Sequence, residues 1–241
     1  MQYNSASISN KGGREVNQDF IGLTQSENGG CWVVADGLGG YQAGEIASKL
    51  AVETILRESK MRNDIHWLKK GIEQTQKVIR EHLLSETNAR SMRTTVVALS
   101  CINNLATWAH VGDTRLYMIR NGKVVVQTKD HSVCQALVNA GEITADQIRF
   151  HEDRNRLYRV LGSEGAVKAT ILENEITVHP GDSFLLCSDG FWEYITEEEM
   201  ENTRLVCSIP SDWLYLMESI LKGRILKNND NYSAIAVFAS E

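Results

Sequence analysis

Four aspartates in this sequence lie in short, turn-like frames at or near the ends of apolar runs, each beside a glycine or an asparagine. A single Asp-Gly or Asp-Asn pair usually belongs to a surface turn. Four such turns, each closing a predicted strand, favour a buried acidic cluster. Hard divalent cations prefer carboxylate oxygens, and two neighbouring cations need several carboxylates. We therefore predict a metal site built from Asp36, Asp113, Asp189 and Asp230.

The overall composition is that of a compact globular protein. Of its 241 residues, 42% are apolar and 23% are charged, so the chain can bury a sizeable core. The 25 basic and 31 acidic residues give a formal charge of −6, which disfavours a general nucleic-acid binder. No apolar run approaches the roughly 20 residues that span a bilayer, and the polar start lacks the apolar segment of a signal peptide. We expect a cytoplasmic monomer that binds neither nucleic acid nor membrane.

The five cysteines are odd in number, widely scattered and mostly inside apolar runs. This pattern is typical of small buried side chains in a reducing compartment. It indicates neither a zinc site nor a disulfide framework. The residues are Cys31, Cys101, Cys134, Cys187 and Cys207.

The first half of the chain predicts a hairpin, two long helices and then four strands. The hairpin joins residues 20–24 to residues 31–35 through a turn that contains Asn-Gly. Apolar residues recur at helical spacing over 46–55 and over 65–83, the second stretch following a candidate cap at Asp64. Because turn residues separate the four strands, we expect one antiparallel meander. These strands cover residues 94–102, 105–111, 116–120 and 124–128.

The second half predicts shorter helices and three more strands. Ser132 opens a helix that stops at Gly141, and Thr144 and Thr196 each begin a capping-box pattern. Residues 151–165 are polar and irregular. The remaining segments are a strand pair formed by 170–178 and 183–187, a helix over 211–221 that ends at Gly223, and a last strand over 233–239.

Predicted helices and strands occur in blocks and not in β-α-β alternation. This order is typical of an α+β protein in which helices pack outside antiparallel sheets. No linker, repeat or low-complexity segment interrupts the chain. We expect one domain over residues 1–241, with two antiparallel sheets packed together and helices outside them.

Eight short motifs follow one another along almost the whole chain. They are Arg14-Glu15-Val16-Asn17-Gln18-Asp19, Val34-Ala35-Asp36-Gly37-Leu38-Gly39-Gly40, Gly44-Glu45-Ile46-Ala47-Ser48, Thr94-Thr95, Val111-Gly112-Asp113-Thr114-Arg115, Asp130-His131-Ser132, Leu186-Cys187-Ser188-Asp189-Gly190 and Asp230-Asn231. In this order and approximate spacing, the chain from about Ala6 to Phe238 resembles the protein phosphatase 2C family and is similar to its compact bacterial members. The resemblance implies a metal-dependent phosphoserine and phosphothreonine phosphatase with an αββα sandwich. It also implies a partner Ser/Thr kinase whose action the phosphatase opposes.

A catalyst of phosphate-ester hydrolysis must neutralise charge and supply a nucleophile at neutral pH, because the substrate dianion repels hydroxide. Two Mn²⁺ or Mg²⁺ ions would do both. We place Asp36 between them, with the Gly37 carbonyl as a further oxygen ligand. Asp189 and Asp230 would complete the shell of one ion. A water between the ions would attack phosphorus in line, so no cysteine nucleophile is needed.

Three further residues carry expected roles. Arg14 is the expected phosphate clamp, because its planar fork can donate two hydrogen bonds to substrate oxygens; the alternative is a surface salt bridge. Asp19 is expected to act through metal-bound waters. Asp113 resembles the aspartate that holds an additional, third ion with Asp189 in bacterial relatives. The sequence around Asp113 is also typical of a tight turn with an Asp-Arg pair, and surface pairs contribute little stability.

Departures from the family pattern leave questions open. Gln18 stands where many relatives have glutamate, which weakens the acidic shell. Leu38 stands where several eukaryotic relatives carry a histidine, so that a general acid would have to be water or another group. Arg93 replaces the usual glycine, and either the backbone differs locally or a second cation reaches the site. The segment over about 131–165 resembles the flap that helps to select substrates.

Two other function classes stay open. The chain could be a non-catalytic binding or scaffolding module of the same fold, or it could hydrolyse small phosphate esters. Retention of the four aspartates and of Arg14 argues against the first class. A phosphoprotein is the expected substrate.

Overall fold

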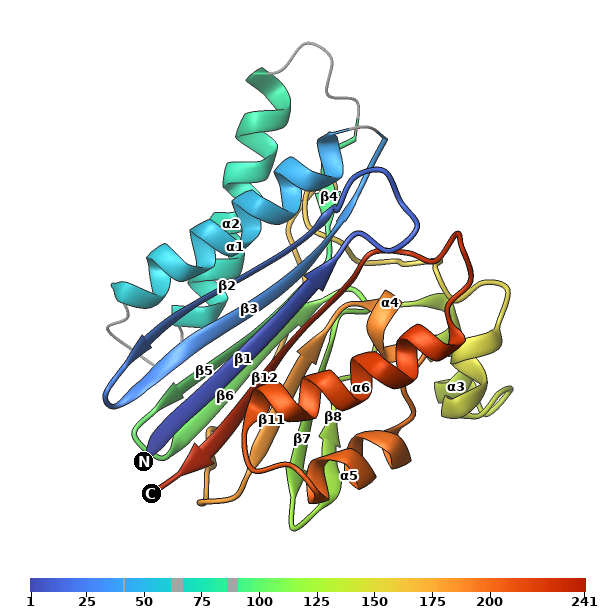
Figure 1. The fold of residues 1–241 in the computed structure, drawn as a ribbon. Coiled ribbons are helices and arrows are strands. Elements are labelled where there is room, and N and C mark those ends of the chain that lie inside the picture. The colour runs from blue at the N-terminus through green and yellow to red at the C-terminus, as the bar shows by residue number, and fades with distance from the viewer. Residues whose placement is uncertain (41, 62–66, 86–90) are drawn as a thin grey trace.

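The computed structural model describes residues 1–40, 42–61, 67–85 and 91–241 (Figure 1). Within these ranges no helix is both long and apolar enough to cross a membrane. The predicted helix cap at Asp64 lies outside the described residues.

Two antiparallel sheets face each other at the centre of the fold (Figure 1). The five-stranded sheet has the order β1 (Gln2–Asn10), β12 (Tyr232–Ser240), β11 (Ser183–Cys187), β7 (Arg115–Arg120) and β8 (Lys123–Gln127). The seven-stranded sheet has the order β10 (Ile176–Thr177), β6 (Leu105–Val111), β5 (Val96–Ile102), β3 (Gly29–Leu38) and β2 (Asp19–Ser26), with β4 (Arg93–Thr94) beside β3 and β9 (Thr170–Ile171) beside β6.

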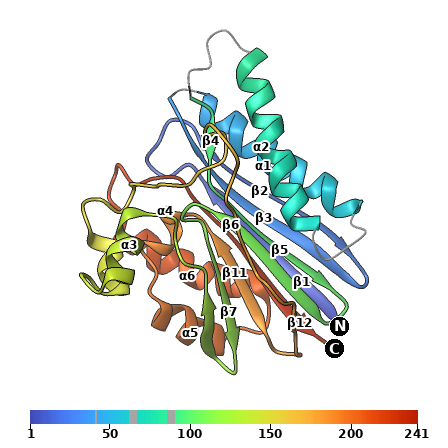
Figure 2. The same ribbon diagram turned by 180° about the vertical axis from the view of Figure 1, so that it is seen from behind.

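Helices cover the outer face of each sheet. Figure 2 shows α1 (Ala43–Lys60) and α2 (Trp67–Ser85) on the seven-stranded sheet, and α5 (Glu197–Leu205) and α6 (Pro210–Arg224) on the five-stranded one. The shorter α3 (Val133–Ala140), the 3₁₀ helix η1 (Ala145–Phe150) and the one-turn α4 (Asp189–Trp192) lie near one end of the sandwich. The expected α+β sandwich of two antiparallel sheets flanked by helices is confirmed.

The core consists of three apolar layers, because successive strand residues point to opposite faces of a sheet. Val33 packs under α1 and α2, whereas Val34 packs between the sheets. On β11, Leu185 packs under the helices of the other side and Leu186 packs between the sheets. Central strands buried on both faces appear in sequence as continuous apolar runs.

The predicted four-strand meander is wrong, because β6 and β7 belong to different sheets. The chain leaves one sheet after β6 and enters the other at β7, with Gly112 at a φ of +100° in the crossing. A Cβ atom at Gly112 would lie 2.5 Å from the Thr95 side chain, so the crossing also requires close contact. Because β6 and β7 are both almost wholly buried, no alternation of polar residues distinguishes this crossing from a hairpin.

The predicted pairing of residues 170–178 with 183–187 is also wrong. β9 and β10 both pair with β6, whereas β11 lies in the other sheet between β7 and β12. The turn over residues 179–182 is therefore also a crossing between the sheets. The predicted end of the last helix at Gly223 is early, since α6 continues to Arg224.

Local helix signals are confirmed. The Ser132 side chain accepts a hydrogen bond from the Gln135 amide and caps α3, and Gly141, with a φ of +76°, ends it. Capping boxes open η1 at Thr144 and α5 at Thr196. These boundaries depend on hydrogen bonds between residues close in sequence, and local sequence therefore predicts them.

Packing between the sheets provides a direct test of the sandwich. Leu186→Ala, in the layer between the sheets, is expected to lower the free energy of unfolding by about 2–5 kcal/mol, because it leaves a cavity that the two sheets cannot close. Leu23→Ala, at an exposed position of edge strand β2, is the matched control, with a loss below about 1 kcal/mol. Urea unfolding measures both, and equal losses would contradict the packing described.

Candidate metal centre

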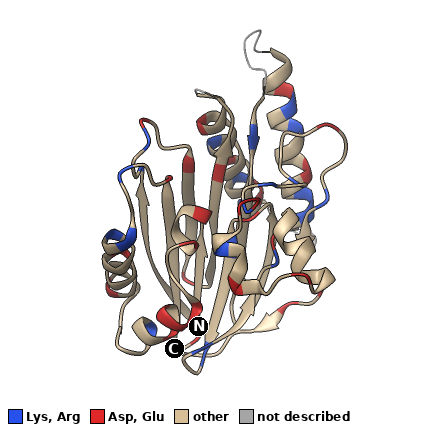
Figure 3. Cartoon of the chain, turned by 90° about the vertical axis from the view of Figure 1, so that its right-hand side faces the viewer, with Lys and Arg blue, Asp and Glu red and all other residues tan. Residues whose placement is uncertain are grey.

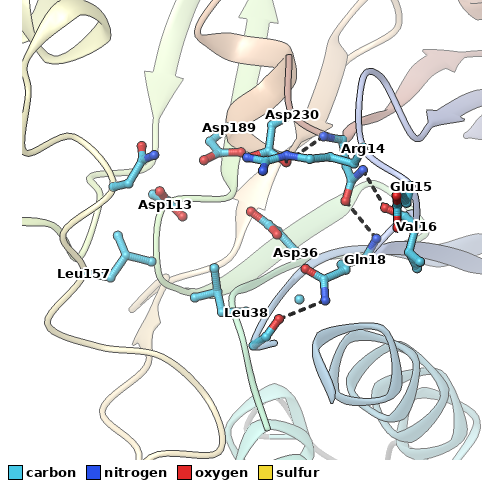
Figure 4. Close-up of a pocket in the computed structure, with 14 residues that line it drawn as sticks. Arg14, Glu15, Val16, Gln18, Asp36, Leu38, Asp113, Leu157, Asp189 and Asp230 are labelled. Atoms are coloured by element: carbon cyan, nitrogen blue, oxygen red, sulfur yellow. Dashed lines mark hydrogen bonds and ion pairs between the residues drawn. The ribbon is translucent and has the colours of Figure 1, made fainter. Parts of the chain in front are cut away.

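A cavity of about 540 Å³ opens at one end of the sandwich. The chain termini lie together at the other end, because β1 and β12 run antiparallel with Gln2 opposite Ser240 (Figure 3). The four aspartates of the predicted metal site line the cavity, and so do Arg14 and Gly37. Figure 4 shows that these acidic side chains come from different elements and surround a common space. The structure thus brings the predicted residues together.

Asp36 lies near the end of β3, where the Thr94-Thr95 pair holds its backbone. The Asp36 carbonyl accepts hydrogen bonds from the Thr95 amide and the Thr94 hydroxyl, both at 2.8 Å. The Asp36 amide donates to Thr95 Oγ1 at 3.2 Å. A Cβ atom at Gly37 would lie 2.1 Å from the Gly44 carbonyl oxygen, so only glycine fits there. The backbone is therefore held by its neighbours while the Asp36 carboxylate faces the cavity (Figure 4).

Asp189 and Asp230 meet where α4 packs against the segment before β12. Asp189 is the first residue of α4. A Cβ atom at Gly190 would lie 2.0 Å from the Asn231 carbonyl oxygen, so this close approach requires glycine. Asp189 Oδ1 accepts from the Gly190 amide at 2.6 Å, and Asp230 Oδ1 accepts from the Asn231 amide at 2.8 Å. These local hydrogen bonds orient both carboxylates.

Asp113 lies in the crossing between β6 and β7, on the other side of the cavity from Arg14 (Figure 4). The alternative interpretation, a turn in which Asp113 pairs with Arg115, does not describe the partner that Arg115 has in the structure. Arg115 instead binds Asp130 through two hydrogen bonds of 2.8 and 2.7 Å, with both side chains only 2% exposed. Asp113 Oδ1 is buried and has no hydrogen-bond partner among the described residues.

Asp19 lies directly opposite Asp36 in the pairing of β2 with β3. Its Oδ2 accepts a hydrogen bond from the Ser188 hydroxyl at 2.7 Å, and Ser188 Oγ accepts one from the Ser233 amide at 2.9 Å. Its Oδ1 is buried without a partner in the described part of the chain. Asp19 is absent from the described residues that line the cavity, so its expected action through water stays a prediction.

Burial and like charge together raise the proton affinity of this cluster. Burial, followed by the charges of neighbouring aspartates, raises the pKa of Asp36 and of Asp189 well above the ordinary carboxyl value. Burial likewise raises the pKa of Asp113 to about 7 and that of Asp19 to about 6. Protons or cations would relieve the repulsion between these groups.

The residues present fit hard cations that keep part of their water shell. The side chains that converge on the cavity offer carboxylate oxygens, and the buried Oδ1 atoms of Asp19 and Asp113 have no partner among the described residues. Within the described ranges, no three acidic, histidine or cysteine side chains converge closely enough to hold one ion by themselves. Backbone oxygen and water would therefore complete the shell, as is common for Mg²⁺ and compatible with Mn²⁺.

Arg14 reaches the site from the loop between β1 and β2 and pairs with Asp230. Its Nε and Nη2 donate to the two carboxylate oxygens at 3.0 and 2.8 Å (Figure 4). The arginine side chain is 56% exposed, so a ligand can reach it. The Asn231 side chain ties this loop to β12 by donating to the carbonyls of Lys11 and Val16. Sequence reasoning gave Asn231 no role, although the Asp230-Asn231 pair was the available signal.

The three residues that depart from the family pattern, Gln18, Leu38 and Arg93, lie at different places in the structure. The Gln18 side chain donates to the Gly39 carbonyl at 3.1 Å and supports the loop after β3. Leu38 lines the cavity. Arg93 is exposed on β4 and does not belong to the described lining of the cavity.

The predicted flap comprises α3, η1 and the irregular chain after them. Its start is tied to residues 156–158, since the Val133 amide donates to the Arg156 carbonyl at 2.8 Å and the Tyr158 amide to the His131 carbonyl at 3.0 Å. Leu157, in this segment, lines the cavity (Figure 4). A role in substrate selection stays a prediction.

The raised pKa values predict a pH-dependent stability of the metal-free protein. A carboxyl whose pKa is higher in the folded than in the unfolded state holds its proton more tightly when folded. Stability therefore falls as pH rises from the unfolded value of about 4 through the folded value, which is about 7 for Asp113. We expect Asp36→Asn in EDTA to be more stable than wild type at pH 8, and the difference to shrink towards pH 4.

Urea unfolding over this pH range measures the effect. Glu173→Gln removes one charge at an exposed position and serves as the control, with no comparable gain at pH 8. A lower stability of Asp36→Asn at pH 8 would show that the carboxylate cluster is not under repulsion.

Known proteins resemble this chain in sequence and in fold. The family model of protein phosphatase 2C matches residues 9–219. The serine/threonine phosphatase Stp of Listeria welshimeri is 34% identical over 197 residues, which cover 78% of this chain and 77% of that protein. The protein phosphatase PhpP of Streptococcus pneumoniae is 30% identical over 198 residues, which cover 78% of each.

Solved structures are similar over the whole chain. The serine/threonine phosphatase PstP/Ppp of Mycobacterium tuberculosis has a TM-score of 0.85 at 26% identity and covers all of both chains. A structure of the PstP catalytic domain in complex with two manganese ions has a TM-score of 0.84 at 25% identity over 99% of each chain. Motifs, fold, site geometry and relatives agree, and the chain belongs to the protein phosphatase 2C family.

Proposed function

We propose that this protein is a metal-dependent protein serine/threonine phosphatase, which hydrolyses phosphoserine and phosphothreonine by means of an activated water. The observation that carries the proposal is the convergence of Asp36, Asp189 and Asp230 on one cavity from separate elements. The serine/threonine phosphatases among its relatives support the substrate class.

The division of labour within the site follows from position and charge. Mn²⁺ or Mg²⁺ bound here would neutralise substrate charge and activate water at neutral pH. Asp36, which lines the cavity from near the end of β3, would contact two ions, with the Gly37 carbonyl beside it. Asp189 and Asp230 would help to hold one of these ions from the facing side, where α4 meets the segment before β12. Water would complete the shell, because no three acidic side chains in the described ranges converge closely enough by themselves. Asp19 lies opposite Asp36 in the pairing of β2 with β3 and would orient water through its Oδ1, which has no partner among the described residues.

The number of ions is part of the proposal. The two manganese ions in the related PstP structure support two ions in the core site. We further propose a third position at Asp113, because its buried Oδ1 has no partner among the described residues and it lines the same cavity as Asp189. Mg²⁺ suits the same oxygen-only ligands as Mn²⁺.

Arg14 is proposed as the phosphate-binding residue. Its guanidinium lines the cavity and donates two hydrogen bonds to the Asp230 carboxylate. Arginine binds phosphate with the same paired geometry. When cations neutralise Asp230, the attraction that holds Arg14 on this carboxylate weakens. Arg14 would then be available to bind the substrate phosphate and orient it towards the water.

The cellular role follows the same reasoning. We propose a cytoplasmic, monomeric enzyme with a single domain over residues 1–241, which opposes a Ser/Thr kinase and needs neither nucleic acid nor membrane. The excess of 31 acidic over 25 basic residues supports the absence of a nucleic-acid partner. The flap over about 131–165 borders the cavity through Leu157 and is proposed to contact the phosphoprotein.

Turnover of a phosphothreonine peptide tests the function. We expect activity with Mn²⁺, loss in EDTA and recovery when Mn²⁺ is returned in excess. Asp36→Asn should lower turnover at least about a thousandfold, because the charge between the two ions is removed, while Glu173→Gln stays active. Faster turnover of glucose 6-phosphate would instead indicate a small-ester hydrolase, and a metal-loaded protein without turnover would indicate a binding module.

Thiol alkylation in the same assay tests the nucleophile. All five cysteines are buried, and burial raises the pKa of the Cys187 thiol, the one nearest in sequence to Asp189. Iodoacetamide under native conditions should therefore leave activity unchanged. Turnover that resists EDTA but is abolished by alkylation would overturn the metal mechanism.

A separate prediction concerns Arg14. Arg14→Ala should lower kcat/KM about 10- to 100-fold, because two charge-assisted hydrogen bonds to phosphate are lost. Arg14→Lys should recover part of the loss. Affinity for Mn²⁺ should stay the same or rise, since Arg14 no longer competes for Asp230. Arg93→Ala is the matched control with unchanged kinetics, and a loss of Mn²⁺ affinity in Arg14→Ala would assign Arg14 to the metal site.

A further inference from the structure

Trp192 links two segments of the cavity that are far apart in sequence. Its indole Nε1 donates a hydrogen bond of 2.9 Å to the backbone carbonyl of Asp113. Trp192 is the last residue of α4, and Asp189 is the first residue of the same helical turn. The bond therefore joins the crossing that carries Asp113 to the helix that carries Asp189.

The Trp192 ring is itself held in place by buried charged groups. The Arg115 guanidinium lies over the indole, 3.4 Å from the ring centroid, and Arg149 lies at 5.6 Å. Arg115 is in turn fixed by its paired hydrogen bonds to Asp130. Trp192 is 1% exposed, so the indole has no room to turn away from Asp113.

The position of the Asp113 carboxylate depends on its backbone. Because Oδ1 has no hydrogen-bond partner among the described residues, no described group holds this oxygen in place directly. Contacts to the neighbouring backbone hold the turn: Trp192 binds the Asp113 carbonyl, and the Gly112 amide donates to His131 Nδ1 at 3.1 Å. Of these two contacts, the one from Trp192 leads to the element that carries Asp189.

We propose that Trp192 is a positioning residue that sets the separation between Asp113 and Asp189 and thereby the affinity of the third ion, the one proposed at Asp113. This inference rests on the proposed metal role of Asp113. Trp192 contacts neither substrate nor cation and acts through the Asp113 backbone. Positioning contacts of this kind commonly change metal affinity about 10- to 100-fold.

Two other buried tryptophans provide a comparison away from the cavity lining. Trp213 Nε1 donates to the Met200 carbonyl at 3.1 Å, in the layer beneath α5 and α6. Trp32 Nε1 is buried with no partner among the described residues. Trp213→Phe therefore removes the same type of hydrogen bond away from the cavity and is a matched control for Trp192→Phe.

Mn²⁺ titration followed by the electron paramagnetic resonance signal of the free ion measures the affinity of each successive ion without substrate. We expect Trp192→Phe to weaken the last ion about tenfold and to leave the first two nearly unchanged. Trp213→Phe should leave all steps unchanged, although both variants lose some thermal stability. Equal weakening in both variants, or none in Trp192→Phe, would overturn the inference.

A double-mutant cycle separates this inference from the proposed function. Asp113→Asn should weaken the same last ion, and Trp192→Phe should add no further weakening in that background. If Asp113→Asn leaves Mn²⁺ binding unchanged, the metal role of Asp113 is wrong and the positioning role falls with it. If Asp113→Asn weakens the ion but Trp192→Phe does not, only the positioning role is wrong.

Circular dichroism establishes that each variant is folded. If Trp192→Phe does not fold, replacement of Trp192 by benzothienylalanine removes the N–H donor while keeping the ring size. The same loss of the last ion is then expected, and an unchanged titration overturns the inference.

Discussion

The concentration of buried negative charge at one end of the sandwich is the constraint on which the rest of the structure depends. Burial and mutual repulsion raise the pKa of Asp36 and Asp189, and burial raises that of Asp113. Such a cluster opposes folding unless cations or protons neutralise it. Burial of the three apolar layers around the two sheets stabilises the fold. The metal-free protein can therefore fold although the negative charges of the site are not fully neutralised.

The fold meets this constraint by fixing backbones and leaving carboxylate oxygens available. The threonine pair before β5 holds the Asp36 backbone, and the Trp192 indole holds that of Asp113. Close approaches at Gly37 and Gly190, which no larger residue allows, bring the site segments together. Oxygens of Asp19 and Asp113, by contrast, have no hydrogen-bond partner in the described part of the chain. An arrangement of this kind is preorganised for a ligand that supplies positive charge.

Prediction from sequence succeeded where the signal was local or chemical. The four aspartates meet in one cavity, and caps such as Ser132 and Thr196 lie where short-range hydrogen bonds place them. Prediction failed where strands had to be assigned to a sheet. The chain crosses from one sheet to the other at residue 112, where a meander was predicted, and again between 170–178 and 183–187, which were predicted to pair. The expected substrate contact of Arg14 is untested, and its observed partner Asp230 is 216 positions away.

The sequence by itself determined which side chains offer carboxylate oxygens, where turns and helix caps fall, and which runs are apolar enough to form the core. These properties depend on residue type and on neighbours within a few positions. Only the tertiary structure decided which strands share a sheet, that Arg115 pairs with Asp130, and that Trp192 reaches the Asp113 carbonyl. Strands buried on both faces look alike in sequence, and contacts across the fold depend on how both sheets and their helices pack at once.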